Sequence, residues 1–305
     1  MRSVRNWVLA TFILSLLVII AGGVVRTTQS GMGCPDWPRC FGSWIPPTNA
    51  AELPPDFEKY LSKQDIDHSF NALHTWIEYI NRLLGALLGL FAIIQVALLF
   101  GKRKLMPASW RLAVAFLIVV ILTGLFGALV VKFNLAHLSI SVHLLFAIVL
   151  IQIQLALLLS VRSKLATVII DAKTRKILLA FLVILFIHSI LGTMVRMYVD
   201  EVSKTLRYEQ RETWLAATPV AFLVHRTFSW IVLFTVLALA WYGKRSAFKI
   251  KLYFLTGTIL LSMVTGIVLF YADMPAVAQP LHLLLATLAI TQTCSILLQG
   301  KKLSA

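Results

Sequence analysis

Four side chains that can do chemistry stand within one short apolar run, LHTWIEYINRLL at residues 73–84. They are an imidazole, a carboxylate, an amide and a guanidinium: His74, Glu78, Asn81 and Arg82. If the run is a helix, these spacings place all four on one face. Carboxylates move protons, imidazoles bind metals and guanidinium groups bind anions. The spacing therefore predicts a functional polar stripe on an otherwise apolar helix.

The composition of the whole chain predicts that this helix lies in a membrane. Of 305 residues, 59% are hydrophobic and 13% are charged, whereas a soluble domain has about 25% charged residues. Apolar runs long enough to cross a bilayer recur along the chain. They cover residues 7–25, 74–100, 111–132, 138–161, 177–197, 216–242, 252–271 and 279–299. The predicted fold is an all-α polytopic membrane protein with eight transmembrane helices.

The formal net charge of +15 is distributed as expected for membrane topology. Lys and Arg concentrate at both termini and in every second connection, near 101–111, 162–176 and 243–251, while nearly all acids lie in the other connections. Because basic residues mark the cytoplasmic side, we expect both termini in the cytoplasm and the chain in the cell (inner) membrane. A nucleic-acid-binding protein would gather its charge on one face, so the pattern argues against that class.

The two halves of the chain resemble each other, with four segments matching in the same order. The pairs are 22–31 with 191–200, 80–90 with 224–234, 122–130 with 263–271, and 141–150 with 280–290. Four helices per half is an even number, so both halves have the same orientation in the membrane. We expect two pseudo-symmetric four-helix bundles, one over residues 1–161 and one over 162–305, with cofactor sites between facing helices.

Histidines occupy repeated positions in these predicted bundles. His225 and His282 lie in the sixth and eighth helices, His143 matches His282, and Asn81 matches His225. Two imidazoles at similar depth on facing helices are typical axial ligands of haem iron. The alternative is that each histidine hydrogen-bonds a neighbouring helix, which is the role we predict for His188. The repeat favours a haem site for His225 and His282.

An arginine follows each of the two matched positions on the second and sixth helices. Arg226 follows His225, and Arg82 follows Asn81. A guanidinium beside a haem ligand suits a propionate, which is a carboxylate. The alternative is that each arginine extends to lipid headgroups. The repeat of the pair in both halves favours propionate binding.

The long connection 26–70 carries GMGCPDWPRCFG, with Cys34 and Cys40. The predicted topology puts this loop outside the cytoplasm, where a disulfide between the two cysteines is expected. A metal pair is an alternative, but no second cluster of ligands completes a tetrahedral site. A catalytic dithiol is another, because disulfides closing short loops are often reducible. Cys294 stands alone in the last helix and is expected to pack as a small apolar residue.

Taken together, these motifs resemble the haem A synthase family. The resemblance rests on GGVVRTTQSGMGCPDWPRCFG, on E-x-x-x-R in the second helix, on HR in the sixth, and on LH in the fourth and eighth. It covers nearly the whole chain. It implies an oxidoreductase acting on a CH group, which converts the C8 methyl of haem O to the formyl of haem A by successive hydroxylations, for cytochrome oxidase assembly.

The resemblance also implies a division of labour between the halves. The C-terminal half would hold a haem b cofactor through His225 and His282. The N-terminal half would bind the haem O substrate with His143 as axial ligand and Glu78 as catalytic carboxylate, and the cysteine pair would assist there. Haem O synthase, a membrane electron acceptor and a second copy of the chain are the partners that this function implies.

One position departs from the family pattern. Where E-x-x-H-R is usual, this chain has Glu78, Asn81 and Arg82 at the polar positions, and an amide is a poor iron ligand. The substrate haem could be held by His143 alone, with an open or water-filled sixth position. It could instead be bound by His74, or this half could have lost catalysis. The retained carboxylate, arginine, histidine and cysteines argue against the loss.

Two other classes also fit part of the pattern. A two-haem electron-transfer protein would explain the histidines but neither Glu78 nor the cysteine loop. A transporter would explain the duplicated halves, but it predicts helices broken near mid-membrane with polar groups there. The polar residues of this chain cluster toward one membrane surface instead, which favours the haem-modifying enzyme.

Overall fold

The transmembrane helices dominate the computed structural model, which describes residues 2–61, 69–133, 135, 137–162 and 168–302. Within these residues, eight helices are long and apolar enough to cross a membrane. They are α1 (Arg2–Thr27), α3 (Ala72–Phe100), α4 (Pro107–Lys132), α5 (His137–Ser160), α6 (Ala172–Thr205), α7 (Val220–Tyr242), α8 (Lys249–Tyr271) and α9 (Ala278–Gln299). Lipid offers no hydrogen bonds to the backbone, so apolar runs satisfy it internally as helices. The predicted all-α polytopic fold with eight spans is confirmed.

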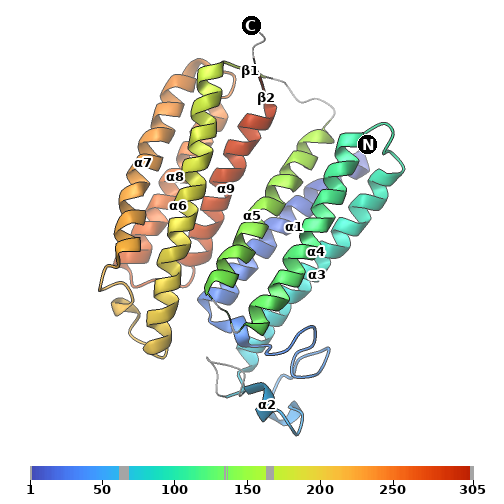
Figure 1. Cartoon of the computed structure of the whole chain (residues 1–305), viewed down its shortest axis with the longest axis vertical. Helices are drawn as coiled ribbons and strands as arrows, with labels where there is room; N and C mark the ends of the chain where they lie inside the picture. The colour runs from blue at the N-terminus through green and yellow to red at the C-terminus, as the bar shows by residue number, and fades with distance from the viewer. Residues whose placement is uncertain (1, 62–68, 134, 136, 163–167, 303–305) are drawn as a thin grey trace. The chain divides into compact units, whose positions relative to one another are not determined.

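The helices form two compact units, Met1–Val161 and Arg162–Ala305, called unit 1 and unit 2 below. In unit 1, α1 and α4 each contact both α3 and α5. In unit 2, α6 and α8 each contact both α7 and α9. Each unit is therefore a closed four-helix bundle, and its helices follow the same neighbour order in both (Figure 1). Each unit has one end that we call its loop end. In unit 1 it is the end at which α3 and α5 begin, and in unit 2 it is the end at which α7 and α9 begin.

Apolar side chains fill unit 1, and one amide pair crosses its core. Phe116 of α4 and Leu99 of α3 are fully buried. The side-chain amide of Gln95 donates to Gln154 over 3.1 Å, and that of Gln154 donates back over 2.8 Å and to the Val8 carbonyl over 2.9 Å. These bonds link α1, α3 and α5, and interhelical hydrogen bonds of this kind contribute about 1 kcal/mol each in a membrane.

Short strands and a helix cap close unit 2 at the end opposite its loop end. Strand β1 (Val168–Ile170) pairs in parallel with β2 (Gly300–Lys302). The Asp171 carboxylate caps α6 by accepting from the backbone N–H of Thr174 at 2.9 Å and from its hydroxyl at 2.6 Å. These two hydrogen bonds lower the pKa of Asp171, because they stabilise the charged carboxylate.

Several helix boundaries differ from the sequence prediction, and two of the differences have a clear local cause. Helix α6 runs to Thr205 rather than to residue 197, because a polar turn continues it, with Arg196 paired to Asp200 at 2.8 Å. Hydropathy alone does not detect such a polar extension. Helix α7 begins at Val220 rather than at residue 216, because Pro219 precedes it and restricts the backbone before the proline to non-helical conformations.

The loop ends of the two units carry different caps. Unit 1 has a long connection with short helices η1 (Ser30–Met32), η2 (Ala50–Glu52) and α2 (Glu58–Leu61). Unit 2 has a shorter connection with η3 (Arg211–Thr213). Trp214, which follows η3, is buried in a cluster with Val199, Phe222 and Met274. The extra chain of unit 1 is the part that carries the two cysteines.

Candidate functional site

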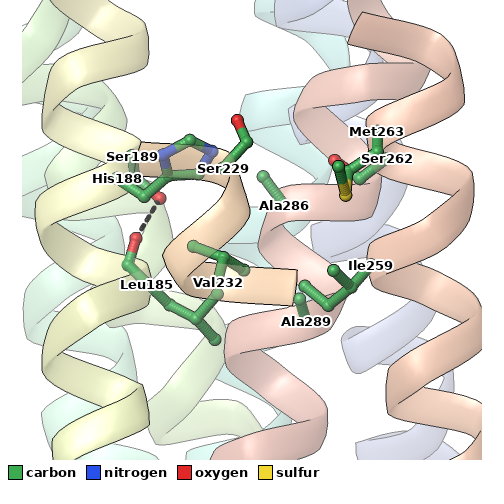
Figure 2. A pocket seen from close by; sticks show the side chains of 10 residues that line it. All are labelled: Leu185, His188, Ser189, Ser229, Val232, Ile259, Ser262, Met263, Ala286 and Ala289. Carbon is green, nitrogen blue, oxygen red and sulfur yellow. Dashed lines mark hydrogen bonds between the residues drawn. The ribbon is translucent and has the colours of Figure 1, made fainter. Parts of the chain in front are cut away.

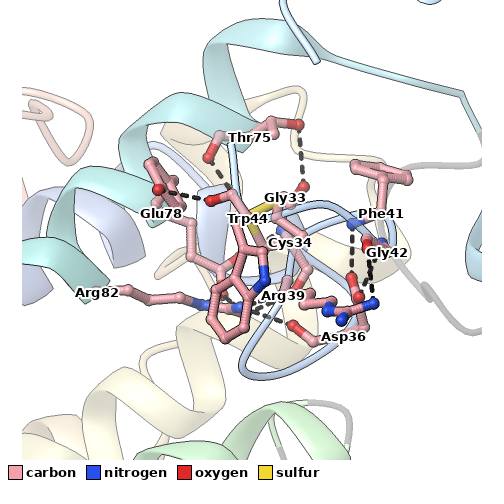
Figure 3. The surroundings of a disulfide bond; sticks show 12 residues. Gly33, Cys34, Asp36, Arg39, Phe41, Gly42, Trp44, Thr75, Glu78 and Arg82 are labelled. Carbon is pink, nitrogen blue, oxygen red and sulfur yellow. Dashed lines mark hydrogen bonds and ion pairs between the residues drawn. A yellow bond between two sulfur atoms is a disulfide. The ribbon is translucent and has the colours of Figure 1, made fainter. Parts of the chain in front are cut away.

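The cysteine loop of unit 1 is fixed to helix α3 by Glu78 and Arg82 (Figure 3). Glu78 is 4% exposed. One of its carboxylate oxygens accepts from the backbone N–H of Cys34 at 2.7 Å. The other accepts from Nε of Arg82 at 3.1 Å and from Nη2 at 2.5 Å. A buried carboxylate is stable only when it is paired and hydrogen-bonded in this way.

Arg82 directs the rest of its guanidinium at the backbone of the same loop. Nη1 donates to the carbonyls of Asp36 at 2.6 Å and Arg39 at 3.1 Å, and Nη2 donates to that of Cys34 at 2.6 Å. With the two bonds to Glu78, all five N–H groups of the guanidinium have acceptors. Arg82 therefore positions the loop, and a haem propionate would have to displace these bonds.

The predicted disulfide is confirmed. Cys34 and Cys40 are bonded, with Cα atoms 4.8 Å apart, and both are at most 1% exposed. They pack against Phe41 and the partly buried side chains Leu53, Tyr60, Phe70 and Tyr79. This burial shields the sulfur atoms from soluble thiols, which favours a structural bond over a catalytic dithiol.

His74 lies where this loop meets the first turn of α3. Its backbone N–H is capped by the Asn71 side chain at 3.2 Å. A Cβ on Gly33 would lie 2.4 Å from the His74 carbonyl oxygen, so this contact requires glycine. His74 is seven residues from Asn81, which corresponds to roughly 10 Å along the helix axis. The structure therefore places His74 beside the disulfide loop, well displaced from the Asn81 position.

In unit 2, the two predicted ligands come together from α7 and α9. The ring centroids of His225 and His282 are 6.5 Å apart, with an angle of 76° between the planes. A metal–imidazole bond is about 2 Å long, so two rings bound to one iron have centroids roughly 6 Å apart. The donor set and its separation fit a bis-imidazole haem.

The ring of His282 is held by its other nitrogen. Nδ1 lies 2.9 Å from the Ser262 carbonyl and 2.9 Å from the Thr265 hydroxyl, both on α8. The carbonyl can only accept, so Nδ1 carries the proton and Nε2 is left with a free lone pair. A histidine that donates in this way to a carbonyl is oriented and made more basic as a metal ligand.

Each proposed ligand rests on a glycine of the neighbouring helix. A Cβ on Gly192 of α6 would lie 3.3 Å from Cε1 of His225, and one on Gly266 of α8 would lie 3.4 Å from Cε1 of His282. In unit 1, a Cβ on Gly127 would lie 3.3 Å from Cε1 of His143. The sequence analysis missed these contacts, although the glycines stand within the repeated segments.

We expect Gly192→Ala to lower the amount of haem b that the purified protein retains, because the added methyl displaces His225 by a few tenths of an ångström. Gly257→Ala on α8 is the matched control, since a Cβ there meets nothing within 4 Å. Both changes raise helix propensity by about 1 kcal/mol, so only the contact differs. Pyridine haemochrome analysis measures the retained haem, and equal retention in both variants would contradict the contact.

His188 of α6 is a further histidine of this site, and it does not play the predicted role. Its ring stacks on that of His225, with centroids 4.1 Å apart and planes 5° apart, and its other neighbour is Phe228 at 5.9 Å. Its Nδ1 is buried without a hydrogen-bond partner among the described residues. The predicted interhelical hydrogen bond is therefore not made through this nitrogen. Instead, the ring of His188 stacks on that of His225 and restrains its plane.

A small cavity lies beside His188 in the core of unit 2 (Figure 2). Its volume is about 30 Å³, and Ser189, Ser229 and Ser262 contribute to its lining. That is room for a single water molecule, and the serines and the unpaired Nδ1 are suitable partners for one. The polar lining continues to Ser262, whose carbonyl holds His282.

The corresponding candidate ligand of unit 1, His143, has no such support. Its Nδ1 is buried without a hydrogen-bond partner in the described part of the chain. In unit 2 the residue before the glycine is Thr265, which contacts His282, but in unit 1 the residue before Gly127 is Phe126. A phenyl ring offers no hydrogen bond, so neither the tautomer nor the orientation of His143 is fixed from this side.

Arg226 is the counterpart of Arg82 in the repeat, but within the described ranges it lacks the ion pair and the bonds to loop carbonyls that Arg82 makes. Its side chain is exposed, and its guanidinium lies 5.6 Å from the ring centroid of Phe222. No carboxylate pairs with it among the residues that the structure describes. Its position after His225 leaves a guanidinium available for a carboxylate at the loop end of unit 2.

The sequence profile of one family covers both of these sites. It is COX15-CtaA, described as cytochrome oxidase assembly protein, and it matches residues 5–294. The chain belongs to this family. The match includes both units, the disulfide loop, and every histidine and carboxylate described above.

Several proteins to which this chain is similar are named heme A synthase. That of Shewanella oneidensis is 30% identical over 160 residues, which are 52% of this chain and 46% of that protein. That of Cereibacter sphaeroides is 32% identical over 117 residues, 36% and 29% of the two lengths. That of Flavobacterium psychrophilum is 29% identical over 164 residues, 48% of each. In each case the match spans less than half of the relative's length.

Proposed function

We propose that this membrane protein is a haem A synthase, which oxidises the C8 methyl group of haem O to the formyl group of haem A by successive hydroxylations. Membership of a cytochrome oxidase assembly family and the names of the relatives support this reaction. The two histidine sites support it independently, because the reaction needs a substrate haem and a route for electrons. Haem b, held in unit 2 by His225 and His282, would supply one-electron transfer.

One observation favours unit 2 as the cofactor half and unit 1 as the substrate half. It is the difference in hydrogen bonding at Nδ1 of His282 and of His143. His282 is fixed by Ser262 and Thr265, whereas Nδ1 of His143 has no partner in the described residues. Loss of such a partner lowers metal affinity about 10- to 100-fold. Unit 2, in which one of the two candidate axial ligands is supported in this way, suits a cofactor that stays. The less supported site, in unit 1, suits a substrate that must leave as product.

Within unit 1, Glu78 is the carboxylate placed to exchange protons with the substrate. It stands three residues before Asn81 on the same face of α3, and it is paired with Arg82. The disulfide loop lies against it, since the Cys34 N–H donates to one of its oxygens and Glu78 is buried. Arg82 holds that loop in place, and Arg226 is the candidate for a haem propionate.

The arrangement in the cell follows from the charge pattern. We propose that the protein lies in the cell (inner) membrane with both termini in the cytoplasm, because the connections rich in Lys and Arg share the side of the termini. The disulfide loop then faces the oxidising side, where its bond persists. Haem O synthase and a membrane electron acceptor are the proposed partners.

Haem analysis of membranes tests this function. Cells that produce this chain together with a haem O synthase should contain haem A, and His143→Ala should prevent its formation while the haem b spectrum stays unchanged. The alternative function, a two-haem electron-transfer protein, predicts bound haem b and no haem A. Haem O that accumulates without conversion, in cells where the chain is inserted and carries haem b, would establish that alternative.

A further inference from the structure

Asn81 of unit 1 stands where unit 2 has the proposed haem ligand His225. Both residues lie in the second helix of their bundle, both are followed by arginine, and the repeats 80–90 and 224–234 align them. Helices α3 and α7 also have equivalent neighbours. The two bundles therefore present an amide and an imidazole at equivalent positions.

The room that the His225 ring fills in unit 2 is not taken by another side chain in unit 1. The segments GVVR and TMVR place Gly22 of α1 opposite Gly192 of α6 in the repeat. A Cβ on Gly192 would have three atoms of the His225 imidazole within 4 Å, whereas a Cβ on Gly22 would meet nothing within 4 Å. The shorter amide at position 81 does not reach across to the glycine.

The amide itself needs a partner. Oδ1 of Asn81 is buried and has no hydrogen-bond partner among the described residues. Leaving a buried polar atom unpaired costs about 1–3 kcal/mol, and an amide can both donate and accept. A small polar guest beside Asn81 would recover this energy.

Unit 1 retains the other histidine of the repeat, which is the proposed axial ligand His143. His143 rests on Gly127 with the same contact that His225 and His282 make with their glycines. Unit 1 therefore offers one imidazole and one short amide, where unit 2 offers two imidazoles. A haem held in unit 1 through His143 would have one strong-field protein ligand, and a site with a single such ligand and a polar neighbour would admit small exogenous molecules.

We propose that unit 1 contains a binding position for a small neutral molecule of the class of water and dioxygen, bounded by Asn81 and Gly22. This inference rests on the proposed binding of haem O through His143. Asn81 supplies a hydrogen bond to the bound molecule, and Gly22 leaves the space that the molecule needs. Unit 2 lacks such a position, because His225 fills it.

Carbon monoxide is a suitable probe, added to the reduced full-length protein loaded with haem O. We expect a carbon monoxide-dependent shift of the Soret band that scales with the content of haem O, while the bis-imidazole haem b does not respond. Asn81→His should abolish the shift without loss of haem, since an imidazole fills the position. Asn81→Leu should keep the binding but change the C–O stretching frequency, because the polar neighbour is lost. His74→Ala should change neither.

Each contrary result separates the inference from the function on which it rests. If the protein binds haem O and forms haem A but takes up no carbon monoxide, the inference is wrong and the function stands. If Asn81→His binds carbon monoxide as the parent does, or if His74→Ala creates the binding, the position at Asn81 is also excluded. If no haem O is bound, the proposed function fails and the inference fails with it. An unchanged low-spin haem b spectrum shows that each variant is folded.

Discussion

Glu78→Gln should nearly eliminate haem A formation while haem O and haem b remain bound. Glutamine keeps the size of the side chain and an oxygen that can accept the Cys34 N–H, but it cannot take up a proton. Removing a general acid or base typically lowers a rate by about 10²- to 10⁴-fold. The measurement is the ratio of haem A to haem O, extracted from membranes that also contain a haem O synthase.

Arg82→Gln is the matched control for this change, because both variants break the same buried ion pair. If Glu78 only holds the disulfide loop, Arg82→Gln should be at least as harmful, since Arg82 makes three further bonds to loop carbonyls. If Glu78 also transfers protons, Glu78→Gln should be much the more severe. Alkylation of Cys34 and Cys40 under reducing conditions reports whether the loop has loosened. Wild-type haem A levels in Glu78→Gln would leave Glu78 as a purely structural residue.

The sequence was sufficient for the fold because lipid leaves few choices. Eight apolar runs had to be helices, and the spacing of charged connections indicated their direction. The same rule could not predict the polar extension of α6 beyond residue 197, where Arg196 and Asp200 stabilise helix outside the apolar run. Helix boundaries set by polar contacts are not visible in hydropathy.

The sequence predicted which residue types form the candidate sites, but it did not predict the contacts that those residues make. Spacing on α3 placed Glu78 and Arg82 on one face, and the structure shows in addition that they are paired. That Arg82 uses its remaining donors on loop carbonyls depends on how the chain folds back from Cys34 to Arg39. The stacking of His188 on His225 likewise depends on the packing of α6 against α7. Such contacts between segments far apart in sequence follow from tertiary structure alone.

His225→Ala and His282→Ala should each abolish the low-spin spectrum of haem b. In a bis-imidazole site, removal of either ring leaves the iron with one strong-field nitrogen, so the spectrum should become high-spin or the haem should be lost. His282→Ala also leaves the Ser262 carbonyl and the Thr265 hydroxyl without their ring partner, so we expect the larger loss of haem from this variant.

His188 is a second candidate for the ligand on this side of the bundle, because its ring centroid lies 4.1 Å from that of His225. His188→Phe keeps an aromatic ring for stacking and removes both nitrogens, so the low-spin spectrum should persist if His225 is the ligand. Exogenous imidazole should restore a low-spin spectrum in His225→Gly and in His282→Gly, but should change nothing in His188→Phe. If instead His188→Phe loses the low-spin spectrum while His225→Ala retains it, the ligand from this side of the bundle is His188, and His225 is the ring that stacks upon it.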